Sequence, residues 1–271
     1  FLLRLQTLQD HRKKQSDKTI VVFFFVPNAI KIIHPEFLES KALFQDIKDM
    51  IDDNIKDIRN KIIYGIANQK LPSEINIFDE DFLFELKNKM VSFKREGEPY
   101  LCTHELINER DIILKSFREN SLLNKKNDKV KVILYPCYLN SSDGLLDLEY
   151  YSVVWGCHLG IFPSYYEPWG YTPIECSAYG VSSITTDLSG LGRYLLKTNE
   201  HDKGVFVVHR ENKSEEEVVK EIADRLYWFS ALSKEGRIRY KIMAENLVHI
   251  FSWEKLVENY IKAHNLALEK I

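Results

Sequence analysis

Several common markers of enzyme chemistry are missing from this chain of 271 residues. Its four cysteines form no C-x-x-C pair and no metal-ligand spacing, so we expect neither a zinc site nor a disulfide framework, and a reduced cytosolic protein is the default expectation. There is no G-x-x-x-x-G-K-[ST] phosphate loop, no G-x-S-x-G elbow and no H-E-x-x-H pair. These absences argue against a serine hydrolase and a zinc protease.

An excess of charge of one sign is absent too, since 37 basic and 40 acidic residues give a formal net charge of -3. We therefore expect no general attraction to nucleic acid or to an anionic membrane, and any anion site must be local. The apolar run "TIVVFFFVP" is far shorter than a membrane span and indicates a buried strand. Neither a secretory signal nor a transmembrane helix is predicted.

Short β-branched or aromatic runs alternate along the chain with segments of helical spacing. The runs cover residues 19–26, 130–138, 158–162, 181–186 and 204–208. Apolar positions such as Leu106, Ile113 and Phe117 show the helical spacing between two of them. This alternation predicts an α/β fold, with a Rossmann-like parallel sheet covered on both faces and a ligand site at the carboxyl ends of its strands.

Roughly a hundred residues separate the first two predicted strands, which is too many for a simple crossover. We expect a helical insertion over residues 36–100, with an apolar stripe on one helix from about Lys41 to Asn68. The stripe can pack on its own domain or dock on another subunit, and the pattern leaves both open. Beyond Arg210, Ser214 and Ser252 are candidate caps of helices that we expect to cover the sheet.

The stretch "FPSYYEPWGYTPIE", residues 162–175, fits neither a core strand nor a surface helix. Pro163 should end a strand, and "EPWG" fits a type I turn that presents Glu167. "TPIE" fits a helix start, with Thr172 as N-cap and Glu175 as the acid of a capping box, and Gly180 is placed to end that helix.

A helix that begins just after a parallel strand presents free N–H groups to an anion. The amides of Gly170, Tyr171 and Thr172 are the candidate phosphate cradle, and the carboxylates of Glu167 and Glu175 suit sugar hydroxyls. With aromatic walls, this combination indicates a nucleotide-sugar pocket. Taken singly, each residue has a plainer reading as a cap, a packing ring or a solvated turn residue.

The segment "CHLGIFPSYYEPWGYTPIECSAYGVSSITTDLSGLG" resembles the signature of the eukaryotic-type glycogen synthases, glycosyltransferase family 3. The resemblance is dense over residues 130–210, and the spacing of Glu167 and Glu175 is similar to the E-x7-E of retaining transferases of the GT-B fold. It implies that residues 1–271 are a GT-B C-terminal, nucleotide-sugar-binding domain. It also implies that the N-terminal acceptor-binding domain, with an Arg and a Lys that hold the diphosphate, precedes Phe1.

The resemblance also implies roles for individual residues. Glu167 would be the catalytic residue that positions the donor glucose and stabilises charge, and Glu175 would hold the ribose hydroxyls. Tyr150 would stack on uracil. The sugar and diphosphate would be lined by Trp169, Gly170, Tyr171 and Thr172.

The reaction implied is transfer of glucose from UDP-glucose to the non-reducing end of an α-1,4-glucan, with retained configuration and with neither a metal nor a further cofactor. The resemblance further implies a cytoplasmic location, a homo-oligomer in the full-length protein and a glycogenin-type primer partner. This part alone is expected to bind UDP weakly and to transfer no glucose. A GT-B transferase that uses ADP-glucose or forms a disaccharide, and a non-catalytic assembly module, are the alternatives.

The family's regulatory helix carries an arginine row for glucose 6-phosphate, and this chain departs from it. Arg237, Arg239 and Lys241 remain as candidate regulatory residues, but Glu235 stands among them. Activation by a sugar phosphate is left open, because a solvated helix face explains the same charges.

Overall fold

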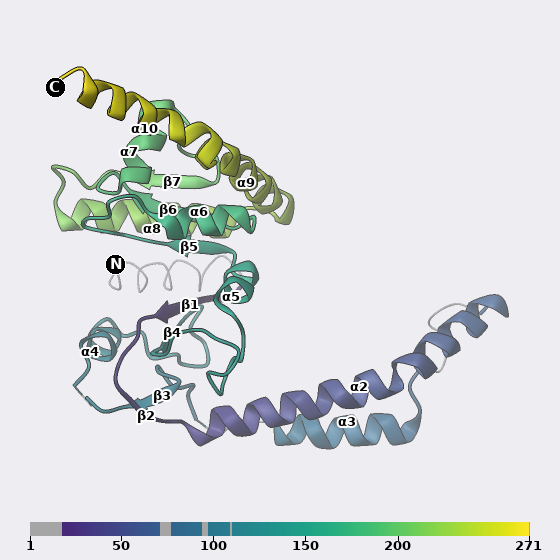
Figure 1. Ribbon diagram of the computed structural model, residues 1–271. Helices are drawn as coiled ribbons and strands as arrows, with labels where there is room; N and C mark the ends of the chain where they lie inside the picture. The colour runs from purple at the N-terminus through teal and green to yellow at the C-terminus, as the bar shows by residue number, and fades with distance from the viewer. Residues whose placement is uncertain (1–17, 71–76, 94–96, 109, 271) are drawn as a thin grey trace. The chain divides into compact units, whose positions relative to one another are not determined.

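The computed structural model describes residues 18–70, 77–93, 97–108 and 110–270, and it divides into two compact units. One unit comprises residues 139–271 with the first twenty residues, and the other comprises Val21–Tyr138 (Figure 1). Each unit is described by itself. The division reflects compactness alone, so the assignment of residues 1–271 to one domain with an insertion at 36–100 stays a prediction.

The larger unit is built on a parallel sheet in the order β5-β6-β7. Its strands are β5 (Leu159–Ile161), β6 (Ser182–Thr186) and β7 (Val205–Val208). Every residue of β6 is buried, as expected of a central strand with both faces covered. The parallel sheet and three of the predicted runs are thereby confirmed.

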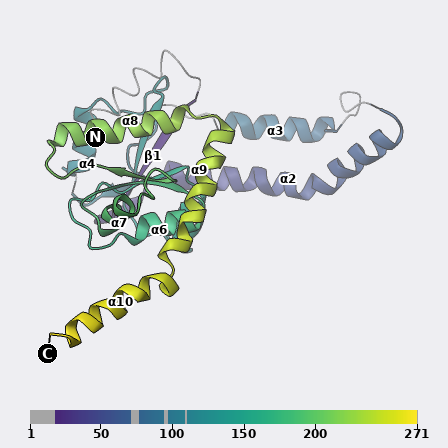
Figure 2. The ribbon, with the colours of Figure 1, turned by 90° about the horizontal axis from the view of Figure 1, so that it is seen from above.

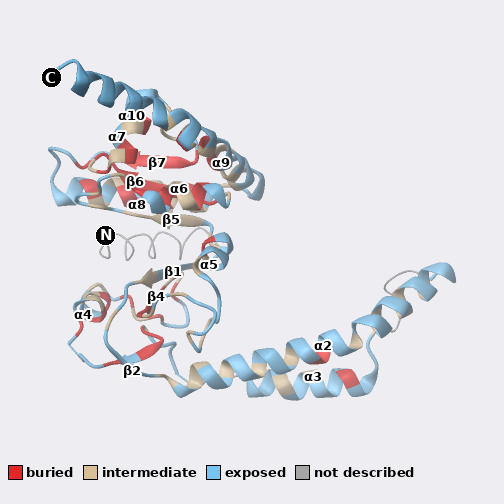
Figure 3. Cartoon of the chain, in the orientation of Figure 1, coloured by how far each residue is buried: buried red, intermediate tan, exposed pale blue. Residues whose placement is uncertain are grey.

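Helices cover both faces of this sheet (Figure 2). α6 (Tyr171–Ala178) and α7 (Gly190–Thr198) lie on one side, and α8 (Glu215–Ala231) lies on the other. The remaining helices are α5 (Tyr150–Gly156), α9 (Lys234–Leu247), the 3-10 turn η2 (Val248–Phe251) and α10 (Trp253–Leu268). Burial is concentrated in β6 and β7, whereas α10 is exposed along its length (Figure 3).

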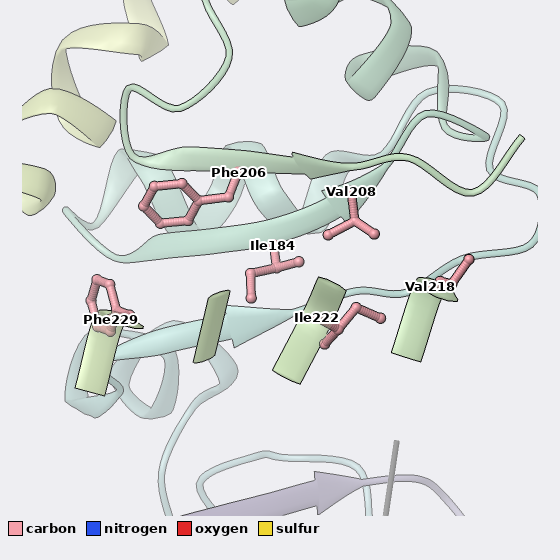
Figure 4. Close-up of a cluster of buried hydrophobic side chains, with 6 residues drawn as sticks. All are labelled: Ile184, Phe206, Val208, Val218, Ile222 and Phe229. Carbon is pink, nitrogen blue, oxygen red and sulfur yellow. The ribbon is translucent and has the colours of Figure 1, made fainter. Parts of the chain in front are cut away.

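Alternate residues of β7 pack into two separate hydrophobic clusters, because successive side chains of a strand point to opposite faces of the sheet. Phe206 and Val208 pack with Ile184 of β6 (Figure 4). Val218, Ile222 and Phe229 from one face of α8 complete this cluster (Figure 4). Val205 and Val207 face the other way, where the cluster is completed by Leu191, Leu195, Leu247 and Phe251.

The predicted cap of α8 is confirmed as a full capping box. The Ser214 hydroxyl accepts from the Glu217 amide, and the Glu217 carboxylate accepts from the Ser214 amide at 2.9 Å. Ser252 also stands at the N-cap of α10, but its side chain makes no capping hydrogen bond. The sequence pattern therefore located both helix starts and correctly predicted the bonding of one.

The second unit holds two small sheets, one pairing β1 (Ile20–Phe25) with β4 (Val130–Tyr135) and one pairing β2 (Ile30–Ile33) antiparallel with β3 (His104–Leu106). The helical spacing that began at Leu106 was misread, because Leu106 belongs to β3 and α4 covers Ile112–Glu119. Asp111 caps α4 by accepting from the amides of Ile113 and Leu114. That cap fixes the helix start six residues after Leu106.

The long helix predicted near residues 41–68 is present as α2 (Pro35–Ala67), and α3 (Glu80–Ser92) packs beside it. Met50 is the buried residue of α2 and Phe82 that of α3. Lys61 bridges the two helices by pairing with Asp57 at 2.8 Å and with Asp79 at 3.4 Å. α3 covers only part of the apolar stripe on α2, so the docking of this stripe on another subunit stays a prediction.

Candidate functional site

A loop from Phe162 to Gly170 carries the first candidate acid from the end of β5 to the start of α6. Glu167 forms a parallel bridge with Ser189, and its amide donates to the Leu188 carbonyl at 3.3 Å. The Glu167 carbonyl accepts from Gly190 at 3.0 Å. The chain bends at residues 168–169, within the predicted turn, but no hydrogen bond closes this turn on itself: the loop bonds outward to the segment before α7.

Gly190 must be glycine for this loop to sit where it does. A Cβ on Gly190 would overlap the Pro168 carbonyl oxygen and would lie 3.1 Å from the Pro168 carbonyl carbon and 3.2 Å from Trp169 Cα. The next amide, that of Leu191, donates to the Trp169 carbonyl at 2.7 Å. The start of α7 therefore positions the loop that bears Glu167.

The helix α6 starts at Tyr171 with Gly170 as its N-cap, which corrects the predicted cap at Thr172. Gly170 is buried and has φ 114°, a backbone angle that residues other than glycine rarely adopt. This conformation turns the chain into the helix two residues earlier than the pattern suggested. Pro173 then occupies the third helical position, where a missing N–H costs nothing because the first amides have no intrahelical acceptor.

No side chain caps this helix. Tyr171 and Thr172 are exposed at its first two positions, and their amides precede the first intrahelical hydrogen bond. Gly180 ends the helix as predicted: with φ 63°, it donates to Ser177, while Val181 donates to Cys176. The candidate phosphate cradle is thus an uncapped helix N-terminus that follows a parallel strand.

Glu175 is not a capping-box acid, because it lies in the second turn of α6. Its Oε2 accepts from the Tyr150 hydroxyl at 3.3 Å, and its Oε1 accepts from the Tyr151 hydroxyl at 3.4 Å. Burial, together with the Glu175 charge, raises the pKa of Tyr150. The Glu175 charge is the main cause that raises the pKa of Tyr151, so both phenols remain protonated donors at neutral pH.

Trp169 is half-buried and packs as part of the core, whereas Tyr171 is 68% exposed. The Trp169 ring meets Tyr194 at 5.8 Å and Phe251 at 6.3 Å between centroids, both edge-to-face. Of these two aromatic residues, Trp169 anchors the loop and Tyr171 is exposed at the helix start. The binding roles assigned to both stay predictions.

Arg210 is a buried residue of the site that sequence reasoning missed. Its guanidinium donates to both oxygens of Glu215, at 2.8 and 3.1 Å, and to the Pro163 carbonyl at 3.1 Å. The same group lies 3.4 Å from the centroid of the Tyr165 ring. Arg210 thereby fixes the beginning of the loop, and an arginine two residues after a predicted strand end was the available signal.

The three candidate regulatory residues all lie on α9 but have different surroundings. The charges of Lys241 and Arg237 both lower the pKa of His158, although burial is the larger cause, so these two lie near that imidazole. Arg237 also donates to the Leu232 carbonyl at 2.6 Å. Arg239 is exposed and has no such link to His158. A regulatory role for any of them stays a prediction.

Within the part of the chain that the structure describes, no three His, Cys, Asp or Glu side chains are grouped so as to hold a metal ion. Within the same ranges, no helix is long and apolar enough to cross a membrane.

Comparison with known proteins accounts for the whole chain. The family model described as glycogen synthase matches residues 1–271. The chain is 36% identical to a glycogen [starch] synthase of Caenorhabditis elegans, with 100% of this chain and 41% of that protein aligned. It is 34% identical to the liver glycogen [starch] synthase of Rattus norvegicus, over 100% of this chain and 38% of that protein.

It is also 33% identical to glycogen [starch] synthase isoform 2 of Saccharomyces cerevisiae, over 94% of this chain and 38% of that protein. The chain thus spans about two-fifths of the length of the curated relatives it matches. Its α/β architecture and its parallel sheet agree with a GT-B glycosyltransferase domain. Together these findings show that the chain belongs to the glycogen synthase family.

Proposed function

We propose that this chain is the donor-binding part of a glycogen synthase that transfers glucose from UDP-glucose to the non-reducing end of an α-1,4-glucan with retained configuration. The observation that carries the proposal is the uncapped N-terminus of α6, flanked by the two acids Glu167 and Glu175. Free amides favour an anion, and carboxylates favour hydroxyl groups. A nucleoside diphosphate sugar carries both kinds of group.

Each part of the donor has a matching group in this proposal. The diphosphate lies against the amides of Tyr171 and Thr172, where the N-terminal end of the helix dipole stabilises the charge that develops on the leaving group. Glu167 holds hydroxyls of the transferred glucose, and Glu175 accepts from the ribose hydroxyls. Tyr150, at the start of α5 and bonded to Glu175, stacks on the base.

Glu167 acts in this scheme as a positioning and charge-stabilising group. Its main chain is held by Leu188, Ser189 and Gly190, which leaves its carboxylate to meet the sugar. No metal is invoked, so helix amides and cationic side chains must stabilise the diphosphate. We propose that the remaining cations and the acceptor-binding surface belong to the rest of the longer protein, which acts in the cytoplasm as a homo-oligomer and extends a glycogenin-type primer.

Titration calorimetry of the chain with UDP at millimolar concentration tests the binding claim. We expect weak binding that Glu175→Gln reduces, whereas the matched change Glu258→Gln, at an exposed position on α10, leaves the affinity unchanged. No heat with UDP would refute the claim. Radiolabelled UDP-glucose and glycogen complete the test, because glucan elongation by this chain alone would contradict the assignment of missing groups to another part of the protein.

Competition between UDP and ADP distinguishes the proposed function from the nearest alternative, a GT-B transferase that uses ADP-glucose. We expect UDP to displace a bound fluorescent UDP analogue and ADP to displace it at least tenfold less well. Sedimentation velocity addresses the assembly role of α2. A chain that stays strictly monomeric would remove the support for α2 as an oligomer contact.

A further inference from the structure

Both oxygens of Glu175 are taken by phenols from two successive residues. Tyr150 donates to Oε2 at 3.3 Å and Tyr151 donates to Oε1 at 3.4 Å. The two tyrosines are the first residues of α5, and their rings meet edge-to-face at 5.1 Å between centroids. A carboxylate has about four lone-pair positions, so one remains on each oxygen after these two contacts.

Tyr151 is itself held by a second ring. It stacks on Tyr179 with 5.2 Å between centroids and 18° between planes. Tyr179 is the C-cap residue of α6, one turn beyond Glu175, and its amide donates to the Glu175 carbonyl. Tyr151 thus bridges the start of α5 to the turn of α6 that carries Glu175.

This bridge matters because Glu175 lies at an incompletely covered position. A glutamate side chain there can take several rotamers, and each wrong one turns the carboxylate away from a ligand. Two donors arriving from one helix, one on each oxygen, restrict the rotation of the carboxylate and leave a lone-pair position on each of two neighbouring oxygens. Vicinal hydroxyls, as on a ribose, are the group that fits such a pair of acceptors.

We propose that Tyr151 is a positioning residue, which holds Glu175 in the orientation that accepts the vicinal ribose hydroxyls of the donor, and that Tyr179 holds Tyr151 in turn. The inference rests on the proposed function, since it assigns the ribose to Glu175. Tyr151 is 44% exposed and Tyr179 is 42% exposed, so a core-packing role does not account for their stacking.

Calorimetry with UDP and with 2′-deoxy-UDP tests the proposal on the full chain. For Tyr151→Phe, which keeps the ring and its stack on Tyr179, we expect UDP to bind about three- to tenfold more weakly. This is the loss typical of one ordinary hydrogen bond, because the contact is long at 3.4 Å and partly exposed. The affinity for 2′-deoxy-UDP should fall less, so the preference for the ribo form shrinks. Tyr260→Phe, at an exposed position on α10, is the matched control and should change neither affinity.

Glu175→Gln separates the failure of this inference from the failure of the proposed function. If Glu175→Gln leaves UDP binding unchanged, the ribose does not reach Glu175 and both proposals fall. If Glu175→Gln weakens binding while Tyr151→Phe leaves the preference for UDP over 2′-deoxy-UDP intact, only the positioning role is wrong. Tyr179→Ala should reduce the preference for UDP over 2′-deoxy-UDP, as Tyr151→Phe does. An unchanged preference would show that Tyr179 does not hold Tyr151 in place.

A second readout needs no ligand. Tyrosine is labelled at the ζ carbon, and the NMR resonance of Tyr151 is assigned as the one that is missing from Tyr151→Phe. The change of its chemical shift with pH gives the pKa of Tyr151. The Glu175 charge raises that pKa, so Glu175→Gln should lower it towards the usual value. Tyr179 also faces Tyr151 and should keep its smaller effect in both proteins. An identical pKa in the two proteins would show that the phenol and the carboxylate are apart.

Discussion

Gly190→Ala places a methyl group against the loop that carries Glu167, and it is the sharpest single test of how that loop is held. The new Cβ would overlap the Pro168 carbonyl oxygen and would lie 3.1 Å from its carbon. Both neighbours are backbone, so no side-chain rotation relieves the clash. The loop or the start of α7 must move.

The expected magnitude follows from the hydrogen bonds across this contact. Gly190 donates to Glu167 at 3.0 Å, Leu191 donates to Trp169 at 2.7 Å, and Glu167 donates to Leu188 at 3.3 Å. Each bond contributes roughly 0.5–1.5 kcal/mol net, and forced overpacking costs about 1–3 kcal/mol. Partial relaxation keeps the sum below its upper limit, so we expect the free energy of unfolding to fall by about 2–4 kcal/mol.

Urea denaturation followed by tryptophan fluorescence is the assay. All four tryptophans lie beyond residue 138, so the signal reports on the unit that contains the loop. UDP affinity is measured beside it, because a loop that shifts without unfolding still displaces Glu167 and Trp169. The matched control is Gly156→Ala, at the end of α5, where an added Cβ meets no atom within 4 Å.

For the control we expect a change of less than about 1 kcal/mol, with any gain coming from the lost backbone freedom of glycine. The reasoning is refuted if Gly190→Ala unfolds within about 0.5 kcal/mol of the unmodified chain and also binds UDP equally well. That pair of results would mean that the loop is not seated on the start of α7.

Three further predictions concern the same unit. Arg210→Met should lower the free energy of unfolding by about 1–3 kcal/mol in urea denaturation, because it removes the hydrogen bonds of a buried guanidinium but leaves the Glu215 carboxylate in contact with solvent. The control Arg239→Met, at an exposed position, should change the free energy of unfolding little. Phe206→Ala should cost about 3–5 kcal/mol in the same assay through the cavity it leaves, and a cost below about 1 kcal/mol would contradict its place in the core. Burial raises the pKa of the Cys176 thiol to about 12. The stability that this shift contributes is therefore fully present below the pKa of the unfolded thiol and is lost as the pH rises towards 12. Alkylation of Cys176 by iodoacetamide at about pH 8.5, measured by peptide mass spectrometry, should be far slower in the native chain than in urea.

The elements with long or strongly patterned sequences were predictable. Buried strands such as 181–186 and 204–208 were predicted from short runs rich in β-branched or aromatic residues, and Ser214 followed by three acids marked a helix start. β2 and β3 were missed because they have four and three residues, too few for any period to show. Their pairing is set by tertiary contact.

The helix start at Gly170 shows a different limit. The string "TPIE" satisfies every local rule for a cap, yet the chain enters α6 two residues earlier. A glycine with positive φ decides the point, and it lies beside Leu191 of α7, whose Cβ is 3.5 Å from where a Gly170 Cβ would be. Local pattern could name both candidates, but only the packing of the loop on α7 selects between them.

The corrected cap changes what the E-x7-E spacing requires. A capping acid at Glu175 would have been fixed by its own helix, and no other element would have needed to touch it. In the second turn of α6, its carboxylate takes its orientation from the phenols of α5 instead, while the backbone of Glu167 is held by the start of α7. The two acids are therefore close in sequence but are supported by different helices. The seven intervening residues supply the bend, Gly170 and the free amides between them. In the function proposed above, this separation of supports would let one short segment face a sugar, a diphosphate and a ribose at once.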